Sequence, residues 1–239
     1  MFDDVRIVRV TDIRCHLAPR EWPFIRNQHQ AIADHWRAVS TGKPSVFNGR
    51  VLLGHTWHQI DDRLEATFFE TDYAAMLGWL AFGEPGDAWN IFAMAALRSI
   101  DGAYLLGEMS GGTAQAGKIY FPAGTPDRGD IIGDTVDLPA SVLRELEEET
   151  GLTREDVIEA PAWTALITGK KVALMREVRS PLPAEALKNR IEAFLSRDPD
   201  AELARMHIVR TDADLDVARM PRATLAFLAH RLCDDQRTG

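Results

Sequence analysis

The sequence predicts a mixed α/β fold in which helices cover a sheet of both parallel and antiparallel strands. Segments that alternate apolar and polar residues, as strands do, are interspersed irregularly with segments of helical periodicity. Several strand segments come in pairs joined by short turns, which favours hairpins over repeated βαβ units. With 239 residues, the chain is long enough for one large domain or for a domain with an extension.

The first 88 residues are predicted to form an N-terminal α+β extension that packs on the rest of the chain. Their signals come in a fixed order: a strand at residues 5–10, a helix at 27–39, a hairpin at 51–60 and 63–69, and a helix from about 72 to 82. A turn-rich break at residues 83–87 follows. We therefore place a domain boundary there, with residues 1–88 as the extension.

Residues 89–239 carry a second set of signals and are expected to form the main domain. In chain order they predict a hairpin at 91–97 and 103–108, a strand at 118–121, a helix at 138–150, a hairpin at 163–168 and 171–178, a helix at 184–195, a strand at 207–209 and a helix at 221–233. A glycine-rich loop at 110–117 follows the first hairpin. This order predicts a mixed sheet that lies between helices.

One of these helices has well-marked ends. Asp137 is a typical N-cap residue, Pro139 suits the first turn, and Gly151 is typical of the residue at which a helix stops. The apolar residues Val142 and Leu146 would pack on a core. The helix is therefore expected between Asp137 and Gly151.

The same helix carries three glutamates on one face. At about 100° per residue, Glu148 lies about 60° to one side of Glu145 and Glu149 about 40° to the other. Such a run can be a solvated acidic face. Three carboxylates on one face repel one another, however, and acids near a helix C-terminus oppose the helix dipole. Mg²⁺ or Mn²⁺, which prefer hard oxygen ligands, would remove this repulsion and could orient a diphosphate.

The run RELEEETGL resembles the second half of the Nudix box, the signature of the Nudix hydrolase superfamily. The matching residues are Arg144, Glu145, Leu146, Glu148, Glu149, Gly151 and Leu152. The resemblance implies a Nudix-type α/β/α sandwich with a mixed sheet over roughly residues 89–234. It also implies a Mg²⁺- or Mn²⁺-dependent hydrolase that cleaves the diphosphate linkage of a nucleoside diphosphate joined to another moiety.

The first half of the box departs from the family pattern. The pattern places a Glu eight residues before the Arg and a Gly six residues before that Glu, and Val136 and Asp130 stand at these positions. A remodelled loop is the simplest explanation. In that case an acid from the loop, such as Asp127, Asp130 or Asp134, could take part in the chemistry.

The resemblance assigns roles residue by residue. Glu148 and Glu149 would ligate the metal with Glu145 as a further ligand, and Arg144 would orient a glutamate through a charge-assisted bond. The general base would be Glu145, Glu148 or one of the loop acids. The candidate substrate-binding residues are Gly124, which resembles the glycine pair that opens the box, and the lysines Lys118 and Lys170.

Residues 47–79 resemble the N-terminal part of Nudix enzymes that hydrolyse UDP-glucose. The likeness rests on the Phe-Asn-Gly turn at 47–49, the pair Asp72 and Tyr73, and the order of a hairpin and a helix. UDP-sugars therefore lead the candidate substrates, with coenzyme A, dinucleotides such as ADP-ribose and nucleoside triphosphates behind them. The alternative function is a catalytically weak Nudix-like domain that binds a nucleotide or sugar phosphate as a sensor.

Composition narrows the possible partners. A formal net charge of −9 argues against a general nucleic-acid surface, although a metal could still bind the phosphates of a small nucleotide. The first ten residues lack the features of a signal peptide, and the apolar segments are too short to span a bilayer, so a cytoplasmic protein without membrane contact is expected. Cys15 and Cys233 are expected to be ordinary thiols. The oligomeric state stays open.

Overall fold

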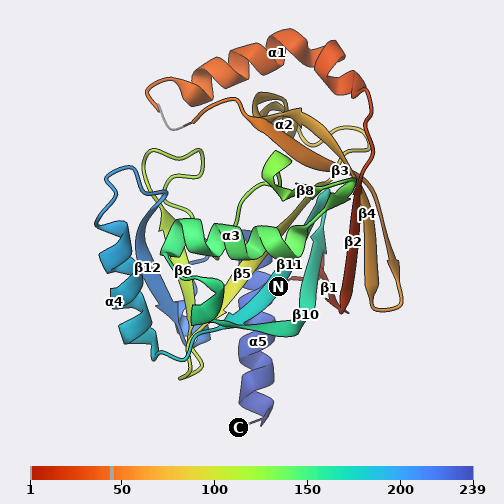
Figure 1. The fold of residues 1–239 in the computed structure, drawn as a ribbon. Helices are drawn as coiled ribbons and strands as arrows, with labels where there is room; N and C mark the ends of the chain where they lie inside the picture. Colours follow the sequence, from red (N-terminus) through yellow and green to blue (C-terminus); the bar gives the residue numbers. More distant parts are fainter. Residues whose placement is uncertain (1, 44–45, 239) are drawn as a thin grey trace.

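The architecture combines two mixed β-sheets with five α-helices in the described part of the chain (Figure 1). The structure is a computed structural model that describes residues 2–43 and 46–238, with side chains described as far as residue 234. No helix within these ranges is both long enough and apolar enough to cross a membrane.

The larger sheet has the strand order β1-β10-β11-β5-β6-β12, with the short β7 paired to β6. Its strands are β1 (Arg6–Val10), β5 (Asn90–Arg98), β6 (Tyr104–Met109), β7 (Ile119–Tyr120), β10 (Ile158–Thr168), β11 (Lys171–Arg179) and β12 (Leu203–Val209). β11 and β5 run parallel, and the other pairs are antiparallel. β5 and β6 follow the predicted turn, but they pair only at Arg98 and Tyr104 before they separate.

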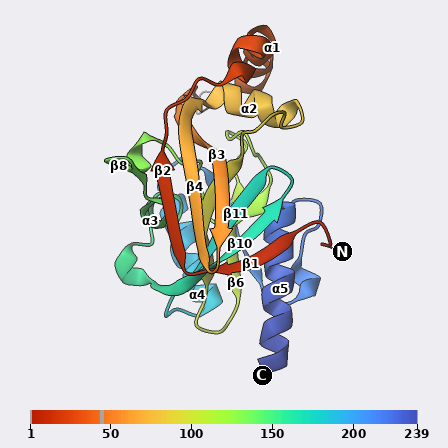
Figure 2. The same ribbon diagram turned by 90° about the vertical axis from the view of Figure 1, so that its right-hand side faces the viewer.

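Helices cover both faces of this larger sheet. α3 (Leu138–Thr150) and α4 (Ala184–Leu195) lie on one face, and α5 (Arg222–Thr238) lies on the other (Figure 2). The residues of β5 alternate accordingly: Ile91 and Ala93 belong to the core beneath α3 and α4, whereas Met94 and Ala96 belong to the core beneath α5. The predicted fold class, an α/β/α sandwich with a mixed sheet, is confirmed.

The smaller sheet has the order β3-β4-β2-β9-β8. Its strands are β2 (Asp12–Leu17), β3 (Arg50–Ile60), β4 (Arg63–Asp72), β8 (Ile131–Ile132) and β9 (Thr135–Val136). Two helices, α1 (Pro23–Ser40) and α2 (Tyr73–Ala81), pack on its outer face through a third apolar cluster that includes Leu53 of β3, whereas Leu52 points into the main core. This small sheet with its two helices supplies the α+β part predicted at the N-terminus.

The chain passes back and forth between the two sheets. β1 precedes residue 88 but forms an edge of the larger sheet, whereas β8 and β9 follow residue 88 but complete the smaller one. The division into residues 1–88 and 89–239 stays a prediction.

Two elements near the N-terminus differ from the predictions. β2 was not predicted at all, and α1 begins at Pro23 rather than near residue 27 because a proline suits the first turn of a helix. Three short 3-10 helices, η1 (Arg128–Asp130), η2 (Arg154–Asp156) and η3 (Asp212–Asp214), complete the described elements.

Candidate active site

Helix α3 forms as predicted. The side chain of Asp137 accepts a hydrogen bond from the backbone N–H of Ala140 at 3.0 Å, and Gly151 adopts the left-handed conformation (φ 68°) that ends the helix. Leu138, Val142 and Leu146 are buried in the main core. Because these residues fix the rotation of the helix, the face with the three glutamates is turned to one side of this core.

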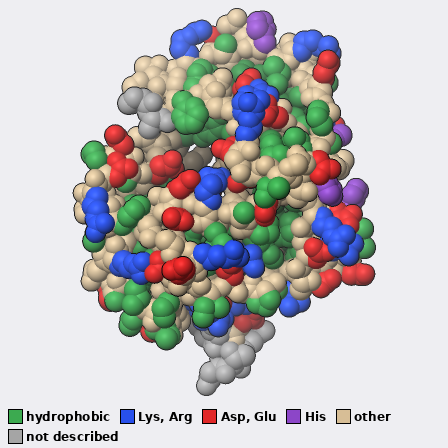
Figure 3. Space-filling view, viewed as in Figure 1, with side chains coloured by type: hydrophobic (Ala, Val, Ile, Leu, Met, Phe, Trp, Pro, Cys, Tyr) green, Lys and Arg blue, Asp and Glu red, His purple; other side chains and the backbone are tan. Residues whose placement is uncertain are grey.

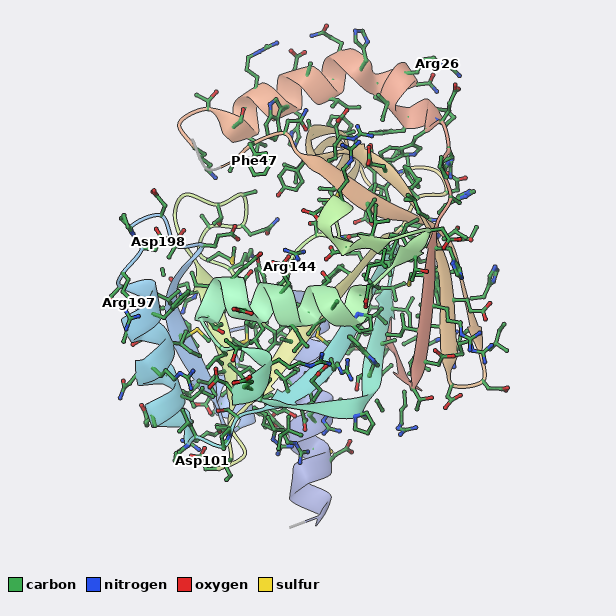
Figure 4. All side chains as sticks on the ribbon, viewed as in Figure 1. Arg26, Phe47, Asp101, Arg144, Arg197 and Asp198 are labelled. Carbon is green, nitrogen blue, oxygen red and sulfur yellow. The ribbon has the colours of Figure 1, made fainter. Side chains whose placement is uncertain are left out.

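A large cavity opens above this face of α3. Its volume is about 1340 Å³, and it extends from α3 past β5, β6 and β7 of the larger sheet to α2 and the start of α5. Figure 3 shows the hollow on the molecular surface, and Figure 4 shows Phe47 and Arg144 on opposite sides of the space. The glycine-rich loop, the turn after α1 and the segment before β12 contribute further walls. The space exceeds that of a typical small-molecule site, about 300–1,000 Å³.

Glu145 stands at the floor of this cavity, largely withdrawn from water. Its carboxylate lies so close to Gly124 that a Cβ at that position would overlap both of its oxygens. Burial, reinforced by the charges of Glu148 and Asp130 and opposed by that of Arg144, raises the pKa of Glu145 to about 7. Gly124, predicted as a substrate-binding residue, therefore lines the cavity and leaves the room that the Glu145 carboxylate occupies.

Glu149 lies deeper than Glu145. Glu149 is 5 % exposed, and neither of its carboxylate oxygens has a hydrogen-bond partner among the described residues. Burial and then the charge of Glu145 raise its pKa well above the ordinary value, and the backbone N–H of Ala123 offsets this only in part. An unsatisfied buried carboxylate is costly unless a ligand or a proton compensates it.

Arg144 ties the acidic groups together. Its Nη2 donates to both carboxylate oxygens of Asp130, at 3.0 and 3.2 Å, and lies 2.7 Å from Oε1 of Glu145. Its Nη1 donates to Glu148 at 3.0 Å. Three carboxylates therefore share one guanidinium, which holds Glu145 and Glu148 in a fixed arrangement.

The departure from the family pattern in the first half of the box has a structural explanation. Val136 stands where the pattern has a Glu; it lies in β9, pairs with Ile131 of β8 and is 2 % exposed in the main core. The acid that contacts Arg144 is instead Asp130, which is 3 % exposed and held in η1 by a capping box with Asp127. Asp127 also lines the cavity, whereas the third loop acid, Asp134, is exposed and lies outside its walls.

Glu202 is a site residue that sequence reasoning missed. It lies before β12, where its backbone carbonyl accepts a hydrogen bond from Ser110 at 2.7 Å, and its side chain stands in the cavity. Burial and then the charge of Glu148 raise the pKa of Glu202. The charge of Glu202 in turn contributes to the raised pKa values of Glu145 and Glu149. No periodic pattern or motif marks this residue, because only the fold brings it next to α3.

The two predicted lysines lie elsewhere. Lys118 Nζ donates to the backbone carbonyl of Ala218 at 3.4 Å, and Lys170 stacks its ammonium over the ring of Trp89 at 4.6 Å. Neither residue lines the cavity. The structure therefore brings Gly124 together with Glu145 and Glu148, but not the lysines.

The acidic residues fit a hard divalent cation in their chemistry. Glu145, Glu148 and Glu149 offer hard oxygen donors, and the unsatisfied carboxylate of Glu149 lacks the partner that a cation would provide. Within the described ranges, no three histidine, cysteine or acidic side chains already stand close enough together to form a metal site. Metal binding at α3 would therefore require these side chains to change rotamer.

Comparison with known proteins gives distant likenesses only. No family model matches the sequence, and neither does any curated protein. A Nudix hydrolase from M. smegmatis, RenU, is 17% identical with a TM-score of 0.39 over 61% of this chain and 84% of that one. A MutT protein from Methanosarcina mazei Go1 is 18% identical with a TM-score of 0.39 over 62% and 96%. A point mutant of the Bacillus subtilis pyrophosphohydrolase BsRppH is 15% identical with a TM-score of 0.33 over 62% and 81%.

Proposed function

We propose that the protein is a divalent-metal-dependent hydrolase that cleaves the phosphoric anhydride of a nucleoside diphosphate joined to another group. The observation that carries this proposal is the arrangement on α3 beneath a large cavity, where one arginine holds Glu145 and Glu148 and the buried carboxylate of Glu149 has no hydrogen-bond partner among the described residues. Burying a carboxylate without a partner costs free energy, and a bound cation would offset that cost.

The three glutamates of α3 would hold the metal. When bound, it would neutralise and polarise the diphosphate and acidify the attacking water. Arg144 keeps Glu145 and Glu148 in position through its bond to the buried Asp130. The cavity lining is itself acidic, with five acidic and three cationic residues among those described, so a polyanionic substrate needs added positive charge to enter.

A carboxylate must accept the proton of the attacking water. Glu148 and Glu202 both reach the open cavity, but Glu148 is engaged by Arg144. The carboxylate of Glu202 accepts no hydrogen bond from a described residue. We therefore assign Glu202 as the proton acceptor, a role for which its raised pKa is suited.

UDP-sugars are the substrates to examine first. The Phe-Asn-Gly turn and the pair Asp72 and Tyr73 meet in space, because Asn48 accepts a hydrogen bond from Ala74 at 2.8 Å and the N–H of Tyr73 donates to Gly49 at 2.9 Å. Phe47 and Tyr73 both line the cavity. Residues that carry the N-terminal resemblance therefore share the cavity with the glutamates of α3, which supports UDP-sugars as the first substrates to test.

Glu148→Gln is the test of this function. With Mg²⁺ and a panel of UDP-glucose, ADP-ribose, coenzyme A and nucleoside triphosphates, we expect the wild type to release phosphate products and Glu148→Gln to lose about 100-fold or more in kcat, the scale of a lost site interaction. The fold should persist, since Glu148 is 59% exposed. Glu147→Gln, an exposed neighbour on the same helix that does not line the cavity, is the control. Undiminished turnover in Glu148→Gln would contradict the proposal.

A sensor remains the second candidate, and one observation favours it. The described acidic side chains are not gathered into a ready metal site. A sensor would bind members of the same panel without releasing phosphate products at any Mg²⁺ concentration. Calorimetric binding without turnover in the wild type therefore separates the two functions.

A further inference from the structure

Two arginines stand at the wall of the cavity and are fixed by one carboxylate. Arg50 comes from β3, Arg128 from η1 and Glu70 from β4. Arg50 Nε donates to Oε1 of Glu70 at 2.6 Å, and Arg128 donates to the same carboxylate through Nε at 2.5 Å and Nη2 at 2.9 Å. The two hydrogen bonds from Arg128 form a planar fork, a geometry that restricts the guanidinium strongly.

These bonds leave one terminal nitrogen of each arginine without an acceptor among the described residues. Arg50 uses Nε and Nη1, the latter bonded to Asp72 at 2.6 Å, and Arg128 uses Nε and Nη2. No described residue accepts a hydrogen bond from Nη2 of Arg50 or from Nη1 of Arg128. Glu70 keeps its charge down to acidic pH, because the bonds from Arg128 and Arg50 lower its pKa to about 2. The pair is therefore pre-organised over the whole physiological pH range.

The pair is also the part of the lining that can meet an anion directly. Three described cationic residues line the cavity: Arg50, Arg128 and Arg144. Arg144 is already shared by three carboxylates on the α3 side. Arg128 lies only two residues from Asp130, the partner of Arg144, and two residues span at most about 7 Å. The two arginines and the acidic groups of α3 therefore line the same cavity, with the backbone of Arg128 close to that of Asp130.

We propose that Arg50 and Arg128, positioned by Glu70, bind an oxyanion carried by the group attached to the scissile diphosphate. This inference rests on the proposed function, because it assumes that the diphosphate lies over α3. The substrate class it names is a nucleoside diphosphate derivative with an additional negative group, either a carboxylate or a further phosphate. Both groups accept two parallel hydrogen bonds from guanidinium donors, which is the chemistry that this pair offers.

The test compares pairs of ligands that differ only in the extra anion. One pair is UDP-glucuronate and UDP-glucose, and the other is the adenosine tri- and diphosphate, each with methylene groups in place of the bridging oxygens between phosphates so that Mg²⁺ can be present without turnover. Calorimetry would measure the affinity ratio within each pair. We expect the wild type to favour the more anionic member of at least one pair about tenfold or more, and the pair that responds tells carboxylate from phosphate recognition.

The double variant Arg50→Gln, Arg128→Gln should reduce that ratio to about one. Arg63→Gln is the matched control, because Arg63 lies on β4 beside Glu65 and Asp12 but outside the cavity, and it should keep the wild-type ratio. A wild-type ratio near one in both pairs, or an unchanged ratio in the double variant, would overturn the proposal. An equal loss of affinity for both members of a pair would also overturn it, since the arginines would then bind the diphosphate itself.

Failure of the anion site and failure of the proposed hydrolase function give different results in these experiments. If the wild type releases phosphate products and the double variant has lost the affinity ratio, both proposals stand. If the wild type shows the ratio but never releases phosphate products, the anion site stands and the hydrolase does not. Folding is monitored by thermal melting, and the single variant Arg128→Gln, whose side chain is 67% exposed, serves if the double variant is unstable.

Discussion

At the scale of single residues, the site depends on the absence of one side chain. Gly124 has ordinary backbone angles, so its role is not conformational; what matters is the space that Glu145 occupies in place of a Cβ. A methyl group there would have to push the carboxylate away from the position that Arg144 and Glu149 surround.

Gly124→Ala should therefore impair the site more than the fold. We expect a loss of about 100-fold in kcat, because a displacement of about 1 Å at a catalytic group has effects of that order. Overpacking costs about 1–3 kcal/mol in stability. Gly111→Ala is the control, because a Cβ at Gly111 would meet nothing within 4 Å. Activity assays beside thermal melting would measure both effects, and full activity in Gly124→Ala would show that Glu145 has no fixed position.

Replacing Asp130 should also impair the site more than the fold. Asp130→Asn removes the charge that Arg144 contacts but keeps the side-chain shape, so the guanidinium would turn toward Glu145 and Glu148. We expect a loss of about 10- to 100-fold in activity, as is typical for groups that orient metal ligands. Steady-state kinetics would measure it, with Asp134→Asn as the exposed control from the same loop. Equal activities of the two variants would refute the orienting role.

At the scale of elements, β12 has to be held in place if Glu202 is to stand in the cavity. β12 is bulged between Leu203 and Arg205, and Glu108 of the neighbouring β6 accepts hydrogen bonds from Arg205, Arg219 and the ring of His207. The hydrogen bond from Arg205 and then that from His207 lower the pKa of Glu108 to about 2, despite partial burial.

This shift predicts how stability depends on pH. A carboxyl group with a lowered pKa stabilises the fold above its unfolded value, near 4.5, and loses that contribution as the pH falls toward 2. Glu108→Gln should therefore unfold more easily than the wild type at pH 7, by about 1–2 kcal/mol after solvent screening. The difference should shrink between pH 4.5 and pH 2. Denaturant melts across this range would measure it, and a constant difference would contradict the assignment.

Sequence patterns predicted these elements unevenly. The ends of α3 followed from Asp137 and Gly151, and α4 was predicted with the bounds that the structure shows, because both helices combine clear periodicity with local end signals. β2 was missed although Ile13, Cys15 and Leu17 alternate along it. β8 and β9 have two residues each and therefore carry no periodic signal.

The residues of the candidate site also divide into those with a local sequence signal and those without one. Helical spacing is a local property, so the sequence alone placed Glu145, Glu148 and Glu149 on one face of α3. The sequence offered Asp127, Asp130 and Asp134 as the acid supplied by the loop. It could not choose among them, because the choice depends on how the loop folds into η1. The sequence could not place Glu202 and Arg50 in the cavity lining, because residues far apart in the sequence become neighbours only through the pairing of strands.

At the scale of the whole molecule, metal binding should be visible as stability. If the native state alone binds Mg²⁺, the free energy of unfolding rises by about 2.7 kcal/mol at a hundredfold excess over the dissociation constant, which shifts the melting temperature by about 5 °C or more. The triple variant Glu145→Gln, Glu148→Gln, Glu149→Gln should lose this shift, whereas Glu147→Gln should keep it. An equal shift in the triple variant would place the metal elsewhere.

The crossing of the chain between its two sheets also governs when the cavity can form. Arg6 of β1 pairs with Ile167 of β10, and the smaller sheet is completed only by β8 and β9. A growing chain on the ribosome therefore cannot complete either sheet until more than half of it has emerged, and such distant pairings slow folding. The binding space thus arises late in synthesis, and a chain that stalls before β9 would have neither sheet complete.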